Sequence, residues 1–358
     1  MRDNCQCPAC FHPTAKNRLL SMGALAIDVR PTAVQVSNDG QEVEVRWSDD
    51  HVSCFTGAWL HDRTLGTFQR EKQSENFRLK MKFWGSEKQG QLRRFSFPLL
   101  RSDDKSLLNF LEVLEMEGVA VINDMPCETD LFKMFTKEKI GYTRPTQYGI
   151  TFSVRSKKTA SNVAYTSSAL DMHNDMVYLE EKPGIQIMHC ISQTKGRGGD
   201  HLLVDSFHAA NQMREKHPEL FRVLTNTVVT FTDVGFDFVG HFHATARRTI
   251  IQCDDNGNVI GTNISNHSRD SHFAVTPEET VTWYKAYLIF WDLLNDPKNY
   301  ITNKLQDGEM IVLDNYRVLH GRTAYQESEG ERHIVSGYWD WDTVKSRRRV
   351  LRAALSNS

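Results

Sequence analysis

Two histidines and an aspartate have the types and spacing of a transition-metal site. His173 and Asp175 form a His-x-Asp pair, and on an extended segment residues two apart project from the same face. His320 follows a strongly apolar run, which can hold its side chain rigidly. Two histidines and one carboxylate form the facial triad of non-haem iron oxygenases, which leaves positions open for a bidentate co-substrate and dioxygen. The pattern therefore predicts iron at these three residues.

A co-substrate with two carboxylates needs a cation beside the metal. Arg332 lies 12 residues after His320, at the start of a strand-like run. An arginine there can hold the far carboxylate of 2-oxoglutarate through a bidentate fork. Taken singly, a His-x-Asp pair occurs by chance in many proteins and a lone arginine is usually a solvated charge. The four residues in this order favour an oxygenase that uses Fe(II), 2-oxoglutarate and O2.

A second group of metal-binding types lies at the start of the chain. Cys5, Cys7 and Cys10 place three soft ligands within six residues, which suits zinc with its four tetrahedral ligands. Such a closed site has no position for substrate, so its role would be structural. The plain alternative is three reduced cysteines in a frayed terminus. The fourth ligand must come from elsewhere, and the candidates are His12, His51, His61 and Cys54.

Composition narrows the class of protein. The chain has 358 residues, 43 Lys and Arg against 45 Asp and Glu, and a net charge of -2, so neither nucleic acid nor a membrane surface is expected as a partner. No run approaches the ~18–20 apolar residues of a membrane span. Seven cysteines without a secretory leader argue against a disulfide framework. We expect a cytoplasmic protein with one large domain, or a large domain and a small one.

The elements that must position these residues are mostly short strands. A polar stretch at 66–95 indicates a linker or surface excursion, and Asn38-Asp39-Gly40 indicates a hairpin turn. The pattern favours a mainly β jelly roll with flanking helices over a doubly wound sheet, because regular strand–helix alternation is missing. Predicted strands are 34–36, 43–47, 119–122, 185–191, 202–205, 310–314 and 333–339, and predicted helices are 104–117, 129–137, 206–216 and 277–295.

A set of short motifs spans essentially the whole chain. They are Arg2-Asp3-Asn4-Cys5, Tyr148-Gly149, Asn162-Val163-Ala164-Tyr165-Thr166, His173-x-Asp175, Pro183-Gly184-Ile185-Gln186, Gly198-Gly199-Asp200, Phe231-Thr232-Asp233-Val234-Gly235, Asp314-Asn315, Leu319-His320-Gly321-Arg322 and Gly337-Tyr338 with Asp340-Trp341-Asp342. With these motifs in this order, the chain resembles the γ-butyrobetaine dioxygenase family, the sister of trimethyllysine dioxygenase.

The resemblance implies a fold and a set of ligands. It implies a double-stranded β-helix (jelly roll) catalytic domain at 91–358 behind a small zinc-bearing β domain at 1–90, assembled as a homodimer. It supports iron at His173, Asp175 and His320, and 2-oxoglutarate at Arg332, with ascorbate as the expected reductant. It also points to Cys5, Cys7, Cys10 and His51 as the four zinc ligands, and so selects His51 among the candidates.

The resemblance further implies an aromatic cage for a trimethylammonium group. The matching positions are Tyr148, Phe152, Tyr165 and Tyr338, and Asn162 lies near the matched cage strand. A quaternary ammonium cannot donate a hydrogen bond, so ring faces worth ~0.5–2 kcal/mol each are its natural partners. From the sequence alone, these aromatic residues would be interpreted as core.

The expected activity is hydroxylation of γ-butyrobetaine to carnitine, the last step of carnitine biosynthesis. Leu203-Val204-Asp205 leans instead toward trimethyllysine dioxygenase, which is the alternative; a non-catalytic metal-binding protein of the same fold is the alternative from another class. The chain departs from the family pattern at Phe152, at Met176 after the His-x-Asp pair and at His201 after Gly-Gly-Asp. Family members usually have residues before the zinc motif, so a mitochondrial location is the alternative if a leader precedes Met1.

Overall fold

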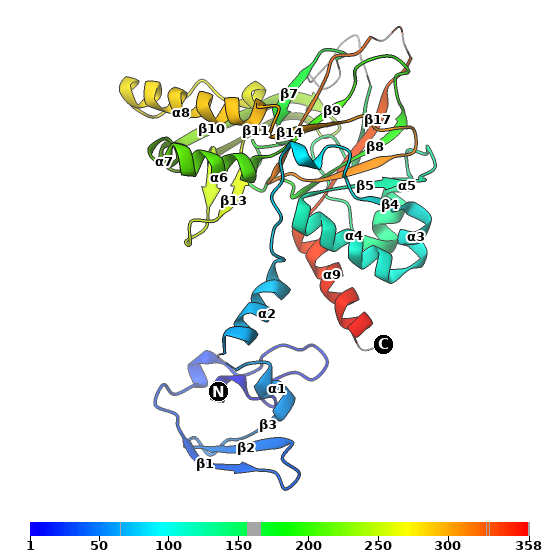
Figure 1. The fold of residues 1–358 in the computed structure, drawn as a ribbon. Helices are drawn as coiled ribbons and strands as arrows, with labels where there is room; N and C mark the ends of the chain where they lie inside the picture. Colours follow the sequence, from blue (N-terminus) through cyan, green and yellow to red (C-terminus); the bar gives the residue numbers. More distant parts are fainter. Residues whose placement is uncertain (65, 156–165, 327, 329, 357–358) are drawn as a thin grey trace. The chain divides into compact units, whose positions relative to one another are not determined.

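The computed structural model describes residues 1–64, 66–155, 166–326, 328 and 330–356. The chain divides into two units, Met1–Phe77 and Arg78–Ser358 (Figure 1). Each unit is described by itself. The predicted division into domains 1–90 and 91–358 stays a proposal about which segments fold independently.

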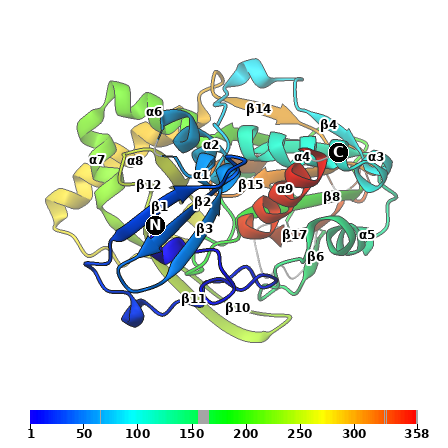
Figure 2. The ribbon, with the colours of Figure 1, turned by 90° about the horizontal axis from the view of Figure 1, so that it is seen from below.

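The first unit contains a three-stranded antiparallel sheet in the order β1-β2-β3, and the three strands lie side by side in Figure 2. The predicted hairpin is confirmed, since Gly40 has a positive φ of 73° in the turn between β1 and β2. The buried apolar core of this unit is small, with Val45, Trp47 and Phe55 at its centre. The elements are η1 (Arg2–Asn4), η2 (Met22–Ala24), β1 (Pro31–Val36), β2 (Glu42–Trp47), β3 (Val52–Thr56), α1 (Gly57–His61) and α2 (Thr67–Phe77).

The second unit is built on two facing sheets of a jelly roll. One has six strands in the order β4-β5-β15-β8-β17-β6, and its pairs are antiparallel except β4 with β5. The other has four antiparallel strands in the order β14-β9-β16-β7. The strands are β4 (Arg94–Ser96), β5 (Val119–Asn123), β6 (Thr151–Val154), β7 (Leu170–His173), β8 (Ile185–Ser192), β9 (His201–Asp205), β14 (Tyr300–Asn303), β15 (Met310–Asp314), β16 (Val318–Arg322) and β17 (His333–Trp339).

Two groups of helices flank these sheets. Helix α4 lies beside α9 (Figures 1 and 2), and α6, α7 and α8 pack together over the four-stranded sheet. Between α7 and α8 in the sequence, the chain forms two hairpins, β10 with β11 and β12 with β13. The bounds are α3 (Phe97–Ser102), α4 (Asp104–Glu117), α5 (Leu131–Phe135), the π-helix η4 (Thr136–Ile140), α6 (Ser206–Lys216), α7 (Pro218–Asn226), β10 (Val228–Asp237), β11 (Gly240–Thr249), β12 (Ile251–Cys253), β13 (Val259–Thr262), η6 (Asn266–Ser268), α8 (Pro277–Asn295) and α9 (Trp341–Ser356).

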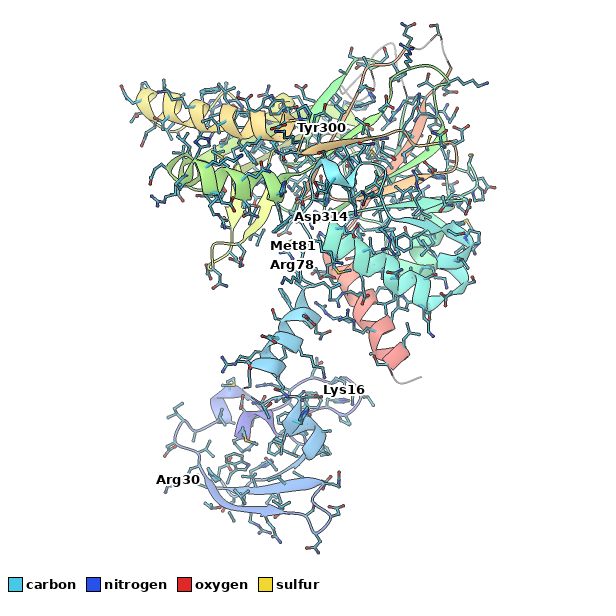
Figure 3. The ribbon with its side chains drawn as sticks, viewed as in Figure 1. Lys16, Arg30, Arg78, Met81, Tyr300 and Asp314 are labelled. Atoms are coloured by element: carbon cyan, nitrogen blue, oxygen red, sulfur yellow. The ribbon has the colours of Figure 1, made fainter. Side chains whose placement is uncertain are left out.

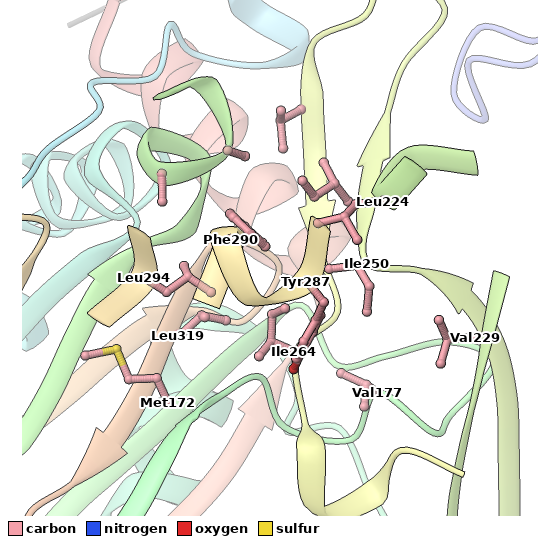
Figure 4. Close-up of a cluster of buried hydrophobic side chains, with 14 of the residues drawn as sticks. Met172, Val177, Leu224, Val229, Ile250, Ile264, Tyr287, Phe290, Leu294 and Leu319 are labelled. Carbon is pink, nitrogen blue, oxygen red and sulfur yellow. The ribbon is translucent and has the colours of Figure 1, made fainter. Parts of the chain in front are cut away.

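The buried core of the second unit sets the direction in which the side chains of β7 and β16 point. Met172 of β7 and Leu319 of β16 pack with Phe290 and Leu294 of α8 (Figure 4). Because neighbouring residues of a strand face opposite sides, burying Met172 and Leu319 against α8 turns His173 and His320 the other way, into the space between the sheets.

The sequence-based helices at 104–117, 206–216 and 277–295 are confirmed. Their ends follow from local chemistry: Thr276 and Glu279 form a capping box, and Gly118 ends α4 with a positive φ of 74°. The prediction of a linker at 66–95 is wrong in part, because this stretch contains α2, η3 (Ser86–Lys88) and β4. Trp84 is buried there, and Figure 3 shows Arg78 and Met81 where the second unit begins.

Candidate metal centres and active site

The three predicted iron ligands lie together between the two sheets. His320 of β16 is the direct cross-strand partner of His173 of β7, and their ring centroids are 4.3 Å apart. The Oδ1 atom of Asp175 lies 3.2 Å from Nε2 of His173 and 3.8 Å from Nε2 of His320. Adjacent ligands on an octahedral ion with bonds of about 2.1 Å are about 3 Å apart. The three atoms therefore fit one face of such an ion.

Asp175 reaches this face by a different route from the one predicted. Strand β7 ends at His173, and Asp175 begins a turn in which Met176 has a positive φ of 55°. The expected extended His-x-Asp segment is therefore wrong for its second member. The turn, rather than the period of a strand, brings the carboxylate beside the imidazole.

The protonation states of the triad suit metal binding. Burial, followed by the neighbouring His173, lowers the pKa of His320 to about 3, so its imidazole is neutral at ordinary pH. Burial alone would raise the pKa of Asp175, but the imidazoles of His320 and His173 lower it overall. Nδ1 of His173 lies 2.8 Å from the carbonyl oxygen of Asp171, a contact in which Nδ1–H donates and Nε2 stays available to a metal.

Residues of the six-stranded sheet hold the Asp175 side chain. Gln186 of β8 and Tyr338 of β17 are cross-strand partners. The Tyr338 hydroxyl donates to Oδ2 of Asp175 at 2.7 Å, and the Gln186 amide also donates to that oxygen. Burial, followed by Asp175, raises the pKa of Tyr338, which keeps its hydroxyl a donor. One carboxylate oxygen thus faces the imidazoles while the other is fixed by the opposite sheet.

The backbone of Asp175 is held by Asn315. The Asn315 side-chain oxygen accepts from the Asp175 N–H at 2.9 Å, and its amide nitrogen donates to the Asp175 carbonyl at 3.0 Å. The same nitrogen donates to Pro183. Sequence reasoning missed the roles of Asn315 and Gln186. Both stand inside the quoted motifs, but nothing about an amide side chain by itself signals contact with a metal ligand.

Arg332 lies at one end of a cavity that also contains the triad. The cavity encloses about 850 Å³ of empty space, counting its open mouth. Every second residue from Arg332 onward faces it, as the period of a strand requires. Its walls include Tyr148, Phe152, Val154, Leu170, His173, Asp175, Met176, Tyr178, Gln186, Met188, His201, His267, His320, Gly321, Arg322, Arg332, Ile334, Ser336 and Tyr338.

The Arg332 guanidinium has the surroundings of an anion-binding group. Its side chain is buried, and burial, followed by Arg322, lowers its pKa to about 10. The group is still a cation at neutral pH. Among the described residues it forms no ion pair and its Nε has no hydrogen-bond partner, although the guanidinium lies over the Tyr325 ring, 5.8 Å from the ring centroid. A buried cation left in this state is costly. The carboxylate of 2-oxoglutarate would satisfy it, so the residues present fit this co-substrate.

Three of the predicted cage residues form an aromatic wall of the same cavity. The rings of Phe152 and Tyr338 are stacked with centroids 6.0 Å apart, and Tyr148 lies 5.4 Å from Phe152. Asn162 and Tyr165 fall outside the described residues. The structure therefore brings together Tyr148, Phe152 and Tyr338 from β6, β17 and the loop before β6.

Four further residues line the cavity. Met176 and His201 depart from the family pattern, and His267 and Tyr178 were given no role from the sequence. Met176 and His201 are buried and face the cavity. The ring of His267 stands edge-on to His173 at 5.2 Å, and burial, followed by His173, lowers its pKa to about 4. Tyr178 accepts a hydrogen bond from Gln147 at 2.9 Å. For Tyr178 and His267, only the three-dimensional arrangement shows that they line the cavity of the triad, because their own sequence contexts carry no metal or substrate pattern.

The first unit brings Cys5, Cys7, Cys10 and His51 together. Nε2 of His51 lies 3.2, 3.7 and 3.6 Å from the sulfur atoms of Cys5, Cys7 and Cys10. Ligands about 2.0–2.3 Å from a tetrahedral zinc ion are about 3.6 Å from one another. The cluster therefore has zinc-like dimensions, and the other candidates for the fourth ligand, His12, His61 and Cys54, lie outside it.

Arg2 and Asp49 join the two segments of this cluster. The Arg2 guanidinium donates to Sγ of Cys10 at 3.4 Å and to Asp49 at 2.8 Å. Asp49 also accepts from the His51 backbone at 3.2 Å. Burial would raise the pKa of Cys7, but hydrogen bonds from Cys5 and from backbone amides lower it overall. The closed set of four ligands favours a structural metal.

A search of the described helices finds none that combines the length and the apolar character needed to cross a membrane.

Comparisons with known proteins match both units. Residues 77–338 match the family described as taurine catabolism dioxygenase TauD, TfdA family, and residues 1–61 match gamma-butyrobetaine hydroxylase-like, N-terminal. The gamma-butyrobetaine dioxygenase of Pongo abelii is 36% identical over 100% of this chain and 91% of its own length. The mitochondrial trimethyllysine dioxygenase of Gallus gallus is 28% identical over 98% of this chain and 82% of its own length.

A solved structure agrees with the fold of the second unit. The crystal structure of asparagine oxygenase in complex with Fe(II), 2S,3S-3-hydroxyasparagine and succinate aligns with a TM-score of 0.51 at 14% identity. It covers 67% of this chain and 82% of that one. At this identity the likeness supports the jelly-roll fold alone.

Proposed function

The chain belongs to the gamma-butyrobetaine dioxygenase family within the TauD, TfdA dioxygenases, and on this premise we propose that it hydroxylates γ-butyrobetaine to carnitine, the last step of carnitine biosynthesis. The observation that carries the proposal is one cavity with three features: a His2Asp triad in the middle, a buried guanidinium at one end and an aromatic wall beside the triad. These suit a metal, a dicarboxylate co-substrate and a trimethylammonium substrate.

The enzyme depends on Fe(II) and 2-oxoglutarate, as its family does. We assign Fe(II) to His173, Asp175 and His320, and the far carboxylate of 2-oxoglutarate to Arg332. When bound, this pair of cofactors supplies oxidising power, because O2 converts 2-oxoglutarate to succinate and CO2 while the substrate C–H bond is hydroxylated. The chain's own residues keep the His320 imidazole neutral, keep the Asp175 carboxylate ionised and hold the dicarboxylate by its far end.

The aromatic wall sets the position of the substrate. Tyr148, Phe152 and Tyr338 would hold the trimethylammonium group by their ring faces, each contributing ~0.5–2 kcal/mol. Arg332 directly precedes β17 and Tyr338 lies near the end of that strand, so the two are about 20 Å apart along the chain. The co-substrate and the cation would therefore approach the metal from different sides. The hydrogen bond from Tyr338 to Asp175 fixes the wall relative to a metal ligand, which positions the target carbon.

Side-by-side turnover of γ-butyrobetaine and trimethyllysine tests this proposal. The assay would contain Fe(II), 2-oxoglutarate and ascorbate, and each hydroxylated product would be identified by mass. We expect γ-butyrobetaine to have the higher kcat/KM. A higher kcat/KM for trimethyllysine would move the chain to the sister activity. Stoichiometric iron with no 2-oxoglutarate consumption on either substrate would favour a non-catalytic metal-binding protein.

Three further proposals concern the whole protein. We propose structural zinc at Cys5, Cys7, Cys10 and His51, supported by the dimensions of the cluster. We also propose a homodimer and a cytoplasmic location, on the resemblance to the family. Metal analysis, light scattering of the purified protein and imaging of the tagged chain test them in turn.

A further inference from the structure

A carboxylate stands directly behind the aromatic wall. Asp233, on β10, accepts a hydrogen bond from the Tyr148 hydroxyl at 3.1 Å. Tyr148 faces the cavity, whereas Asp233 is not among the residues of the cavity wall. The chain therefore places a negative charge one hydrogen bond away from the predicted cation site, on the far side of a ring that would touch the substrate.

This charge has no cation of its own in the described part of the chain. Among those residues Asp233 forms no ion pair. Its neighbours are the hydroxyls of Tyr148 and Tyr178 and the imidazole of His267, which is neutral because burial lowers its pKa to about 4. Its influence reaches the cavity: burial, followed by Tyr148 and Asp233, raises the pKa of Tyr178. Arg332 at the opposite end is a cation without an anion, so the cavity is polarised along its length, with a positive end and a negative one.

We propose that Asp233 is the counter-charge of the cation site and determines the preference of this cavity for a trimethylammonium group over a neutral group of the same shape. A tyrosine hydroxyl that donates to a carboxylate carries more electron density on its ring, which strengthens a cation–π contact. The carboxylate also attracts the cation directly through a low-dielectric wall. The inference rests on the proposed function, because it assumes that this wall binds the substrate cation.

Asp233→Asn tests the proposal with a matched pair of ligands. One ligand is γ-butyrobetaine, and the other is the carboxylate in which a tert-butyl group replaces the trimethylammonium group. Dissociation constants would be measured by anaerobic calorimetry with Fe(II) and 2-oxoglutarate present, so that no turnover is needed. For charges roughly 10 Å apart at an effective dielectric constant of 20, we expect the preference for the cation to fall about tenfold.

Two variants separate this role from a structural one. Asp237→Asn removes the same charge about 13 Å further along β10, where Asp237 accepts from the Phe238 backbone at the hairpin turn; it should leave the preference unchanged. Tyr148→Phe removes the connecting hydroxyl, and the further effect of Asp233→Asn in that background should be smaller.

The outcomes are distinct. If Asp233→Asn weakens both ligands equally, Asp233 only supports the fold of the hairpin and the proposal is overturned. If the wild-type protein binds neither ligand, the proposed function itself fails, which is a different result. A preference that falls in Asp233→Asn but not in Asp237→Asn supports the proposal.

Discussion

The two candidate metal sites differ in how their ligands are supplied and in whether the site is closed or open. In the first unit, three ligands come from one short segment and the fourth from the end of a hairpin turn, and together they close a tetrahedron. In the second unit, two ligands come from one strand end and its turn and the third comes from a distant strand, whose register places His320 beside His173, and the three leave one side facing a cavity.

The difference fits the roles proposed for the two sites. The first unit has a small apolar core centred on Val45, Trp47 and Phe55, and small domains with such cores need another source of stability. A closed site can provide it, because binding of a structural metal is coupled to folding. The second unit has large cores on both sides of its sheets, so we expect it to fold without a metal, and its metal can keep open positions for reaction.

Removing a ligand from the closed site should have the largest effect. Cys7→Ser should abolish stoichiometric zinc and unfold Met1–Phe77, since structural zinc contributes on the order of 10 kcal/mol at neutral pH. Metal analysis and limited proteolysis would measure both. Iron binding by the second unit should persist, because all of its ligands lie within that unit. Cys54→Ser, which removes an exposed thiol outside the cluster, is the control, and full zinc retention in Cys7→Ser would contradict the assignment.

Removing a ligand from the open site should abolish chemistry and leave the fold in place. His173→Ala should lower substrate-dependent CO2 release from 2-oxoglutarate by about 1,000-fold or more, given the several kcal/mol that a metal contributes to a transition state. Thermal unfolding of the second unit should change little. His208→Ala, a change in α6 away from the triad, is the control. Wild-type turnover in His173→Ala would be incompatible with iron at this position.

The ligands of both sites could be proposed from sequence because their residue types are distinctive. Clustered cysteines and a His-x-Asp pair with a later histidine are uncommon, and strand register places His320 beside His173. The cage was accessible only through family resemblance, since Tyr148 and Phe152 look like core residues. Asn315 and Asp233 stand in the motifs without a role, because their importance lies in hydrogen bonds to a functional residue, two from Asn315 to the Asp175 backbone and one from Tyr148 to Asp233.

The fold was predictable where local signals dominate. Helices α4 and α8 have strong caps, and their bounds agree with the prediction. Helix α9 was missed because its buried stripe of Val344, Arg348 and Leu351 contains a charged residue. Arg348 is paired with buried Glu115 at 2.8 Å, and a partner so far away in sequence cannot be foreseen from helical periodicity. The β10–β11 hairpin was missed because its outward positions mix apolar and polar residues.

Metal affinity of the open site should also depend on Asn315, which holds the backbone of Asp175. Asn315→Ala removes both hydrogen bonds to the Asp175 peptide, next to the positive φ of Met176. We expect affinity for Fe(II), or for Mn(II) as a stable probe, to fall about 10–100-fold, as for other residues that orient metal ligands. Metal titration of the purified protein measures this.

A matched control is Asn299→Ala. Asn299 is also a buried asparagine with side-chain hydrogen bonds, but it joins Gln212 and Leu293 away from the triad. Both variants should lose stability, and only Asn315→Ala should lose metal affinity. Equal metal affinity in the two variants would reduce Asn315 to a structural residue.

Acid should reveal the smallest effect, at a buried histidine of the second unit that takes no part in either site. Burial, followed by His333, lowers the pKa of His189 to about 4, and neither ring nitrogen has a hydrogen-bond partner among the described residues. The unfolded chain binds this proton near pH 6.5, so between the two values the unfolded state holds more protons. The contribution of His189 to the free energy of unfolding is therefore fully present above about pH 6.5 and is lost as the pH falls toward 4.

Between pH 7 and pH 5.5 this group should cost about 1 kcal/mol of unfolding free energy. His189→Leu should flatten the pH dependence of urea unfolding by that amount and change stability little at pH 7, whereas the exposed His243→Gln should leave the slope unchanged. Since His189 lies on β8 in the six-stranded sheet, the loss belongs to the second unit alone. A slope unaltered in His189→Leu would contradict the assignment of this acid sensitivity to His189.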